Sequence, residues 1–351
     1  MQGCTLPSAQ SVSFATNYFA PIRRPPDART RRTHRAGKQC ASVADLEEKK
    51  TTFEQLEEGL YAYTAEGDPN SGVVIGDDSV MVIEAQATPI LANTLIEHIR
   101  QVTDKPIRYV FLSHYHAVRV LGASAYGADY IISSQGTYDL VVERGQQDYE
   151  SELGRFPRLF QGADSIPGLT WPNLTFDNAM TLWMGKRRVE MMHLGRGHPK
   201  ADAGVWLPDE HGLFSGDLVE YGATPYTGDA DRKARPNTLQ RSRDLGPSML
   251  VPGRGEALKT PELCEAAIAG TQAFLTELYQ AVVTARAGGA DLDEAYRQAY
   301  AVLTPRFGDW VIFEHCLPFD VTRAFDEAGE HPDPRIWTAE RDQEMWHSLQ
   351  D

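Results

Sequence analysis

The stretch Phe111 to Tyr126, FLSHYHAVRVLGASAY, places two histidines directly after a run of apolar residues. His114 and His116 are two positions apart, and such residues lie about 200° apart around a helix, so they cannot share a helix face. The preceding IRYVFLS is typical of a buried strand. On a turn that leaves this strand, both imidazoles can point to one place. Taken alone, the pair is either two polar residues on a surface loop or part of a metal site.

Short strand-like runs, separated by turn signals, occur on both sides of this stretch. LYAYTA, GVVIG and SVMVIE precede it, and MTLWM, RRVEMMHL, AGVWLP and GLFSG follow it. TPILANTLIEHIRQV has apolar residues at helical spacing, and GTYDLVVERGQQDYESELGRFPRLFQ predicts a helix placed to cover a site. From about Thr260 the chain is mainly helical. The pattern predicts an α/β layered domain with a C-terminal helical addition.

Composition excludes several classes of protein. The chain has 351 residues, of which 42% are hydrophobic, so it can bury a full core. Its net charge of -15 argues against a nucleic-acid partner, and the absence of 18 consecutive apolar residues argues against a membrane partner. The cysteines show no CxxC spacing, which favours a reducing, cytoplasmic setting over a disulfide framework or a thiolate zinc site. They are Cys4, Cys40, Cys264 and Cys316.

The first forty residues differ from the rest of the chain. They carry seven Lys and Arg residues and one acidic residue, Asp27, which gives a formal charge of +6 and leaves -21 for the remainder. RRPPDARTRRTHRAG has no apolar segment, so it does not resemble a secretory signal. Such a polar segment buries too little surface to offset chain entropy. We therefore expect a disordered basic arm over residues 1–50, with a targeting or polyanion-binding role as the alternative.

Further polar residues follow other predicted strands. HLGRGHPKADAGVWLP places His198 in a glycine-rich turn before a strand, and GLFSGD places Asp217 directly after one. MLVPGRGE ends a strand and places Arg254 in a turn bracketed by glycines. Polar residues at the mouths of apolar strands are where a rigid scaffold positions functional groups. These strand ends can together build one site.

This ordered series, from Leu60 to Glu256, resembles the metallo-β-lactamase superfamily. The family's pattern is HxHxDH, then a histidine in a turn before a strand, then an aspartate in GD, then a histidine in PGHG. The resemblance implies an αββα sandwich of two mixed sheets, with metal held between them by strand-end loops. We expect that domain over residues 51–258 and a C-terminal helical extension over 259–351.

Matched to the family's pattern, His114, His116 and His198 correspond to its first metal site, and Asp217 to its bridging aspartate. The resemblance thus implies these four as metal ligands. The chain departs from the pattern at Val118, Arg119 and Arg254, which stand where the family has ligands of a second metal. A guanidinium has no lone pair for a metal. The expected site is therefore mononuclear, with one metal ion per chain.

Three imidazoles with an open position are typical of catalytic zinc, which activates water to attack an ester, lactone, thioester or amide. Arginine binds carboxylate or phosphate with two parallel hydrogen bonds, so Arg119 and Arg254 beside Asp217 predict an anionic small-molecule substrate. Arg119, Arg254 and Asp217 are the predicted catalytic residues. One alternative is a mononuclear iron dioxygenase of the same fold. The other is a non-catalytic binding protein whose arginines only pair with Asp217. The sequence leaves a homo-oligomer open.

Two aromatic segments allow two interpretations. GDWVIFEHCLPFDVTRAFDEAG contains Glu314, His315 and Cys316, which belong either to a packed interior helix or to the wall of a pocket. Phe156, with Phe160 and Trp171, can equally line a pocket or pack a core. GxSxG, GxxxxGK[ST] and a strand-to-helix GxGxxG are absent, which disfavours a serine hydrolase, a P-loop enzyme and a Rossmann dehydrogenase.

Overall fold

The computed structural model describes residues 46–198, 201–231, 235–329, 331 and 333–349. Residues 1–45 of the predicted basic arm lie outside the described residues. From Thr51 to Val251 runs of strands are interrupted by helices, and from Pro261 onward the regular structure is helical. No helix in the described part of the chain is long and apolar enough to cross a membrane.

The first sheet is mixed and keeps its strands in chain order, β1 to β7. Its first four strands pair antiparallel, and β4 to β7 pair parallel. The parallel strands are joined by α2 (Pro89–Val102) and α4 (Gln135–Arg155), which begin at the side-chain caps Thr88 and Ser134. The strands are β1 (Thr51–Glu57), β2 (Leu60–Ala65), β3 (Ser71–Ile75), β4 (Val80–Ile83), β5 (Ile107–Leu112), β6 (Tyr130–Ser134) and β7 (Leu174–Phe176).

The second sheet has the order β12-β11-β10-β9-β8. Its strands are antiparallel except for the parallel pair of β11 and β12. The connection into β12 contains α5 (Arg235–Asp244). The strands are β8 (Ala179–Met184), β9 (Arg187–Gly195), β10 (Asp202–Leu207), β11 (Gly212–Phe214) and β12 (Met249–Val251).

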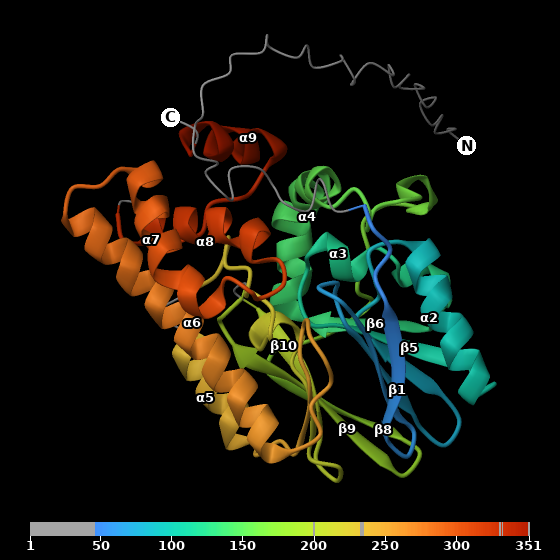
Figure 1. The fold of residues 1–351 in the computed structure, drawn as a ribbon. Helices are drawn as coiled ribbons and strands as arrows, with labels where there is room; N and C mark the ends of the chain where they lie inside the picture. The colour runs from blue at the N-terminus through green and yellow to red at the C-terminus, as the bar shows by residue number, and fades with distance from the viewer. Residues whose placement is uncertain (1–45, 199–200, 232–234, 330, 332, 350–351) are drawn as a thin grey trace, which may run out of the picture. The chain divides into compact units, whose positions relative to one another are not determined.

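Alternation along the strands builds the layers, because successive side chains point to opposite faces of a sheet. In β4, Met81 packs into the core between the two sheets, whereas Val82 packs toward α2 on the outer face. In β10, Val205 joins the same inner core, and Trp206 packs outward with residues of α5 and α6 (Pro261–Ala287). Figure 1 shows α2 beyond the first sheet and α5 and α6 beyond the second. The predicted αββα sandwich is confirmed.

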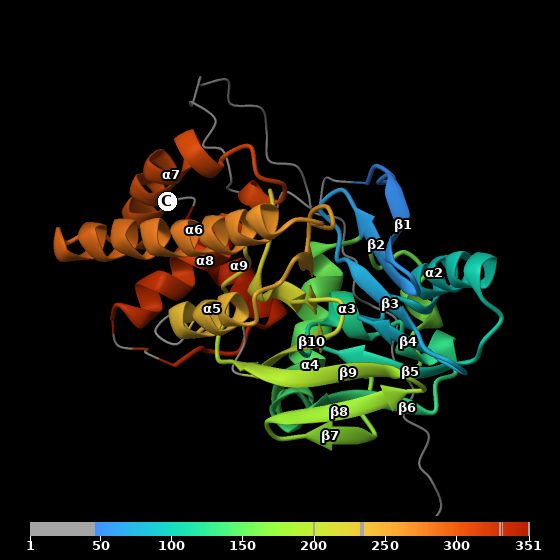
Figure 2. The same cartoon turned by 90° about the horizontal axis from the view of Figure 1, so that it is seen from below.

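The C-terminal helices form a further cluster with its own apolar core. Leu278, Leu303 and Phe319 are among its fully buried residues. The first half of α6 packs on the second sheet and its second half on the other C-terminal helices, as the view in Figure 2 makes plain. The predicted C-terminal helical extension is confirmed, while the domain boundaries remain a prediction. The helices after α6 are α7 (Leu292–Phe307), α8 (Phe313–Glu327) and α9 (Ala339–Ser348).

Candidate metal centre

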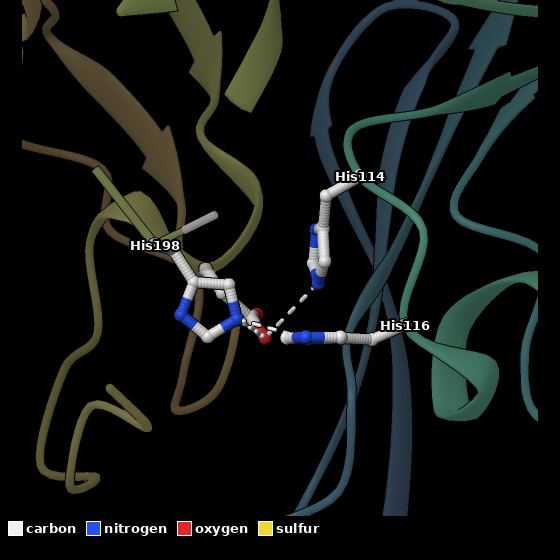
Figure 3. Close-up of side chains that lie close together, drawn as sticks. His114, His116 and His198 are labelled. Carbon is white, nitrogen blue, oxygen red and sulfur yellow. Dashed lines mark hydrogen bonds and ion pairs between the residues drawn. The ribbon is translucent and has the colours of Figure 1, made fainter. Parts of the chain in front are cut away.

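The ends of four strands bring the predicted ligands together. His114 and His116 lie just after β5, and His198 lies between β9 and β10. Asp217 is in the short 3-10 helix Gly216–Leu218 that follows β11. Their potential ligand atoms all lie within 4.8 Å of one another, and all four residues are buried. Figure 3 shows the three imidazoles converging on one point.

In each imidazole, the nitrogen that points away from the centre of the group faces an oxygen atom. This arrangement leaves the other, inner nitrogen to bind a metal ion. His198 donates from Nδ1 to the carbonyl of Tyr226 over 2.7 Å, so its Nε2 carries the lone pair. His114 Nδ1 lies 2.8 Å from Ser113 Oγ, and its Nε2 has no hydrogen-bond partner among the described residues. An orphaned, fully buried nitrogen is costly unless something binds it.

His116 has the opposite ring orientation. Its Nε2 lies 3.5 Å from Asp229 Oδ1, while its Nδ1 is 3.1 Å from His198 Nε2. Asp229 also accepts a hydrogen bond of 2.6 Å from the hydroxyl of Tyr115, which fixes the carboxylate in place. His116 therefore presents Nδ1 to the centre, with Asp229 as the group that orients the ring.

Three separations between inner atoms are close to those of a tetrahedral zinc site. Zinc-nitrogen bonds of roughly 2.0 to 2.1 Å imply ligand atoms about 3.3 Å apart. The distance from His116 Nδ1 to His198 Nε2 is 3.1 Å, and Asp217 Oδ2 lies 3.6 Å from His114 Nε2 and 3.5 Å from His198 Nε2. The donor set of three imidazoles and one carboxylate therefore fits one metal ion.

Protonation differs among the four residues. Burial lowers the pKa of His198 to about 3 and that of His114 well below its usual value, so both are neutral at pH 7. Burial also disfavours the charged form of His116, but Asp229 and Asp148 outweigh it and raise its pKa to about 9. Burial would raise the pKa of Asp217, yet Arg119 and Arg254 hold it well below its usual value. Asp217 is therefore an ionised carboxylate.

The two predicted arginines both contact Asp217. Arg119, in the short helix α3 (Ala117–Val120), has no exposed surface and donates from Nη2 to Asp217 Oδ1 and, over 2.8 Å, to the carbonyl of Gly253. Arg254, which follows β12, donates from Nη1 to Asp217 Oδ2 and to Glu220 Oε1, each over 3.2 Å. Arg254 also lines the cavity beside the metal group. The guanidinium of Arg119 instead donates its hydrogen bonds to Asp217 and to backbone carbonyls.

The cavity beside the metal group is small, at about 10 Å³, which is the space that one water molecule occupies. Helix α4 and the start of α8 close it. The lining residues are His116, Val118, Glu152, Arg155, Phe156, His198, Asp217, Tyr226, Arg254, Ile312, His315 and Cys316. His315 and Cys316 thus belong to a pocket wall and at the same time to a packed helix, whereas Trp171 is exposed.

Sequence reasoning did not identify Arg155, Glu152 or Asp229. The guanidinium carbon of Arg155 lies 4.6 Å from the ring centre of Phe319 and 5.3 Å from that of Tyr226, and the residue is almost fully buried. Glu152 accepts a hydrogen bond of 2.7 Å from the backbone of Val118. One signal was available: Arg144, Asp148, Glu152 and Arg155 recur every three or four residues, so they share one face of α4. All of them are buried.

Comparisons with known proteins point to one superfamily. The sequence profile of the metallo-beta-lactamase superfamily matches residues 64–254. A type 2 metallo-beta-lactamase of Bacillus sp. (strain 170) is 26% identical over 221 residues, which are 58% of this chain and 76% of that protein. The type 2 enzyme of Pseudomonas aeruginosa is 23% identical over 207 residues, covering 57% of this chain and 73% of its own.

Two solved structures share the fold. A metallo-beta-lactamase from Pontibacter korlensis has a TM-score of 0.51 and 19% identity, and the alignment covers 64% of this chain and 99% of that one. A stereoselective inverting sec-alkylsulfatase from Pseudomonas sp. has a TM-score of 0.64 and 15% identity, with 79% of this chain and 50% of that chain covered. The family profile spans more than half of the sequence and includes every residue of the metal group. The chain therefore belongs to the metallo-β-lactamase superfamily.

Proposed function

We propose that the protein is a hydrolase with one zinc ion, held by His114, His116, His198 and Asp217, that cleaves an ester, lactone, thioester or amide of an anionic small molecule. The observation that carries the proposal is the convergence of three inner imidazole nitrogens and Asp217 Oδ2 at the spacing of a tetrahedral site. A zinc ion there, with a water molecule as a further ligand beside the four protein groups, would activate that water and polarise the bond to be cleaved.

The residues around this group hold one metal and favour an anion. Arg119 and Arg254 stand where a second set of ligands would be needed, and a guanidinium cannot bind a metal. Arg119 acts through Asp217, as a positioning residue that keeps the carboxylate ionised and fixed. Arg254 and Arg155 line the cavity, and their guanidinium groups are the donors that a substrate carboxylate, phosphate or sulfate would meet there.

Sulfate esters belong to the substrates worth testing. The sec-alkylsulfatase aligns with a larger share of this chain than the lactamase from Pontibacter korlensis does, 79% against 64%. A sulfate group presents three oxygens to arginine donors, as a phosphate does. An iron dioxygenase and a binding protein without catalysis remain the competing functions, and the metal content separates them from a zinc hydrolase.

The test combines elemental analysis with steady-state kinetics. The purified protein should contain zinc and hydrolyse members of a panel of carboxylate-, phosphate-, sulfate- and uncharged esters, with preference for the anionic ones. Arg254→Met should lower kcat/KM for anionic substrates by about one to two decades, the effect of losing a charge-assisted contact. Arg188→Met, which removes an arginine from a surface ion pair with Glu190, is the matched control. Iron in the protein together with oxygen consumption would indicate a dioxygenase, and metal-free protein that binds its ligand fully would indicate a binding protein. Either result would overturn the proposal.

A further inference from the structure

A second pocket lies next to the small cavity of the metal group. Its volume is about 120 Å³, against about 10 Å³ for the inner cavity. Phe156 and Ile312 line both. These two side chains therefore form the wall between the two spaces. The outer pocket is lined by Lys49, Glu66, Gly67, Asp68, Phe156, Arg158, Leu159, Val311 and Ile312.

Phe156 holds one side of this wall. It directly follows α4, and its backbone N–H donates to the carbonyl of Glu152 over 2.9 Å. Its ring packs on the imidazole of His315 with ring centres 4.2 Å apart. Phe156 is therefore fixed between α4, which supplies Arg155 and Glu152 to the inner cavity, and α8.

Ile312 holds the other side in a strained backbone conformation. Its φ is 58°, in the left-handed region that a β-branched residue rarely adopts. The neighbouring residue keeps it there, because Val311 donates to the carbonyl of Gly222 and accepts from Thr224, each over 3.0 Å. Ile312 is also the N-cap residue, directly before α8. Strain of this kind persists where the surrounding structure imposes it and is concentrated at functional sites.

The outer pocket has two kinds of wall. The part nearest the inner cavity is apolar, with Phe156 and Ile312, and Leu159 and Val311 continue it. The rim is charged, and there Arg158 pairs with both carboxylate oxygens of Asp68. An apolar group attached to a small anion would match this order of surfaces, with the anion at the inner arginines and the apolar group outside.

We propose that the outer pocket binds the apolar part of the substrate, and that Phe156 and Ile312 are specificity-determining residues that form the constriction between this pocket and the metal group. The claim that a substrate binds in the outer pocket rests on the proposed function. The physical claim, a side-chain constriction on the route to the inner cavity, can be tested with neither metal nor turnover.

Cys316 offers a native probe of this route, because it lines the inner cavity and has no exposed surface. Cys264, buried on α6 in a different core cluster, reports general opening of the protein. The full chain is treated with methyl and pentyl methanethiosulfonate, and the rate at each cysteine is followed by peptide mass spectrometry. The variants are Phe156→Leu and Ile312→Gly, the second of which also suits the left-handed backbone. Val142→Ala is the control, because Val142 is exposed on α4 and lines neither pocket.

The expected result is that Phe156→Leu and Ile312→Gly each raise the rate at Cys316 about tenfold or more and leave Cys264 unchanged, since only the local barrier is removed. Val142→Ala should leave Cys316 unchanged. In the Ile312→Gly protein the pentyl reagent should react at Cys316 faster than the methyl reagent, and adding Val311→Asp should remove that preference. The proposal is overturned if Cys316 is insensitive to both substitutions, if Cys264 accelerates in parallel, or if the pentyl preference is absent.

A failed metal or activity assay with this cysteine pattern intact would instead reject the proposed function and leave the two-compartment route standing. Should Ile312→Gly not fold, Phe156→Leu decides the matter, since it changes the other side of the same constriction without touching the strained backbone.

Discussion

Arg119 and Asp217 form an ion pair that has almost no contact with solvent, with exposed side-chain fractions of 0% and 2%. The same carboxylate faces His114 and His198 with its other oxygen. Asp217 therefore joins a protein cation on one side to a candidate metal ion on the other. An arginine at residue 119 therefore does more than remove a ligand of a second metal. Its guanidinium keeps Asp217 ionised and in place, and Asp217 is a candidate ligand of the remaining site.

Arg119→Met is expected to lower the free energy of unfolding of the metal-free protein by about 3 to 5 kcal/mol, because it leaves a buried carboxylate without its main partner. Urea denaturation measures the change. Arg188→Met, at the partly exposed pair with Glu190, should have little effect. An equal loss of unfolding free energy in the two variants would show that the buried pair stabilises the fold no more than the surface pair does.

One metal ion is expected per chain, because the described ligand group contains one set of converging atoms. Titration with zinc followed by elemental analysis should reach a plateau near about one equivalent. The combined variant Val118→Asp, Arg119→His and Arg254→His restores the family's ligand types and should move the plateau toward two. A reproducible value of two in the unaltered protein contradicts the mononuclear site.

Asp229→Ala should weaken zinc binding by about 10- to 100-fold, because the carboxylate that orients His116 is lost. Competition with a chromogenic chelator gives the dissociation constant. Asp129→Ala, which removes the partner of Arg108 on the surface, serves as the control and should leave the affinity unchanged. If both variants bind zinc as the original protein does, Asp229 does not orient the ligand.

Glu84 predicts a dependence of stability on pH. Burial raises its pKa from 4.5 to about 7, although Arg119 and Ser113 act in the opposite direction. Between these values the folded state holds a proton that the unfolded state has released. The free energy of unfolding should therefore fall as pH rises from about 4.5 to 7, by roughly 3 kcal/mol from this residue, and level off above that range.

Glu84→Gln cannot titrate and should flatten this part of the profile in the metal-free protein. Its amide oxygen can still accept the hydrogen bond of 2.9 Å that Ser113 donates to Glu84. Urea denaturation at intervals from pH 4.5 to 8 measures both profiles. Parallel profiles for the two proteins would mean that Glu84 has an ordinary pKa in the folded state.

The sequence predicted the layers, and its four candidate ligands lie together in the structure, because both features follow from local patterns. Met81 and Val82 alternate within a short apolar run, and His114 and Asp217 each come directly after such a run. A residue that ends a strand stays at the edge of the sheet whatever else packs nearby. Such features depend on a few neighbouring positions in the chain, so a single sequence is enough to predict them.

The cavity wall could not be predicted in the same way. Arg155 and Glu152 are charged residues in a helix, and charged residues are rarely buried unless they are paired. Their burial depends on Asp342 of α9, 3.9 Å from Arg155, and on the backbone of Val118, neither of which is near in sequence. The role of Arg119 has the same origin: its position after the histidine pair was plain, but its contact with Gly253 depends on the fold.

The roof of the inner cavity is contributed by Ile312, His315 and Cys316, which lie outside residues 64–254 that the family profile matches. All the residues of the metal group lie inside that range. On the proposed function, the residues that would hold the metal and part of the wall that would select the substrate thus lie in separate stretches of the chain. Exchanging the C-terminal helices between relatives of this protein should therefore change which molecules fit the inner cavity, while the four candidate ligands stay unchanged.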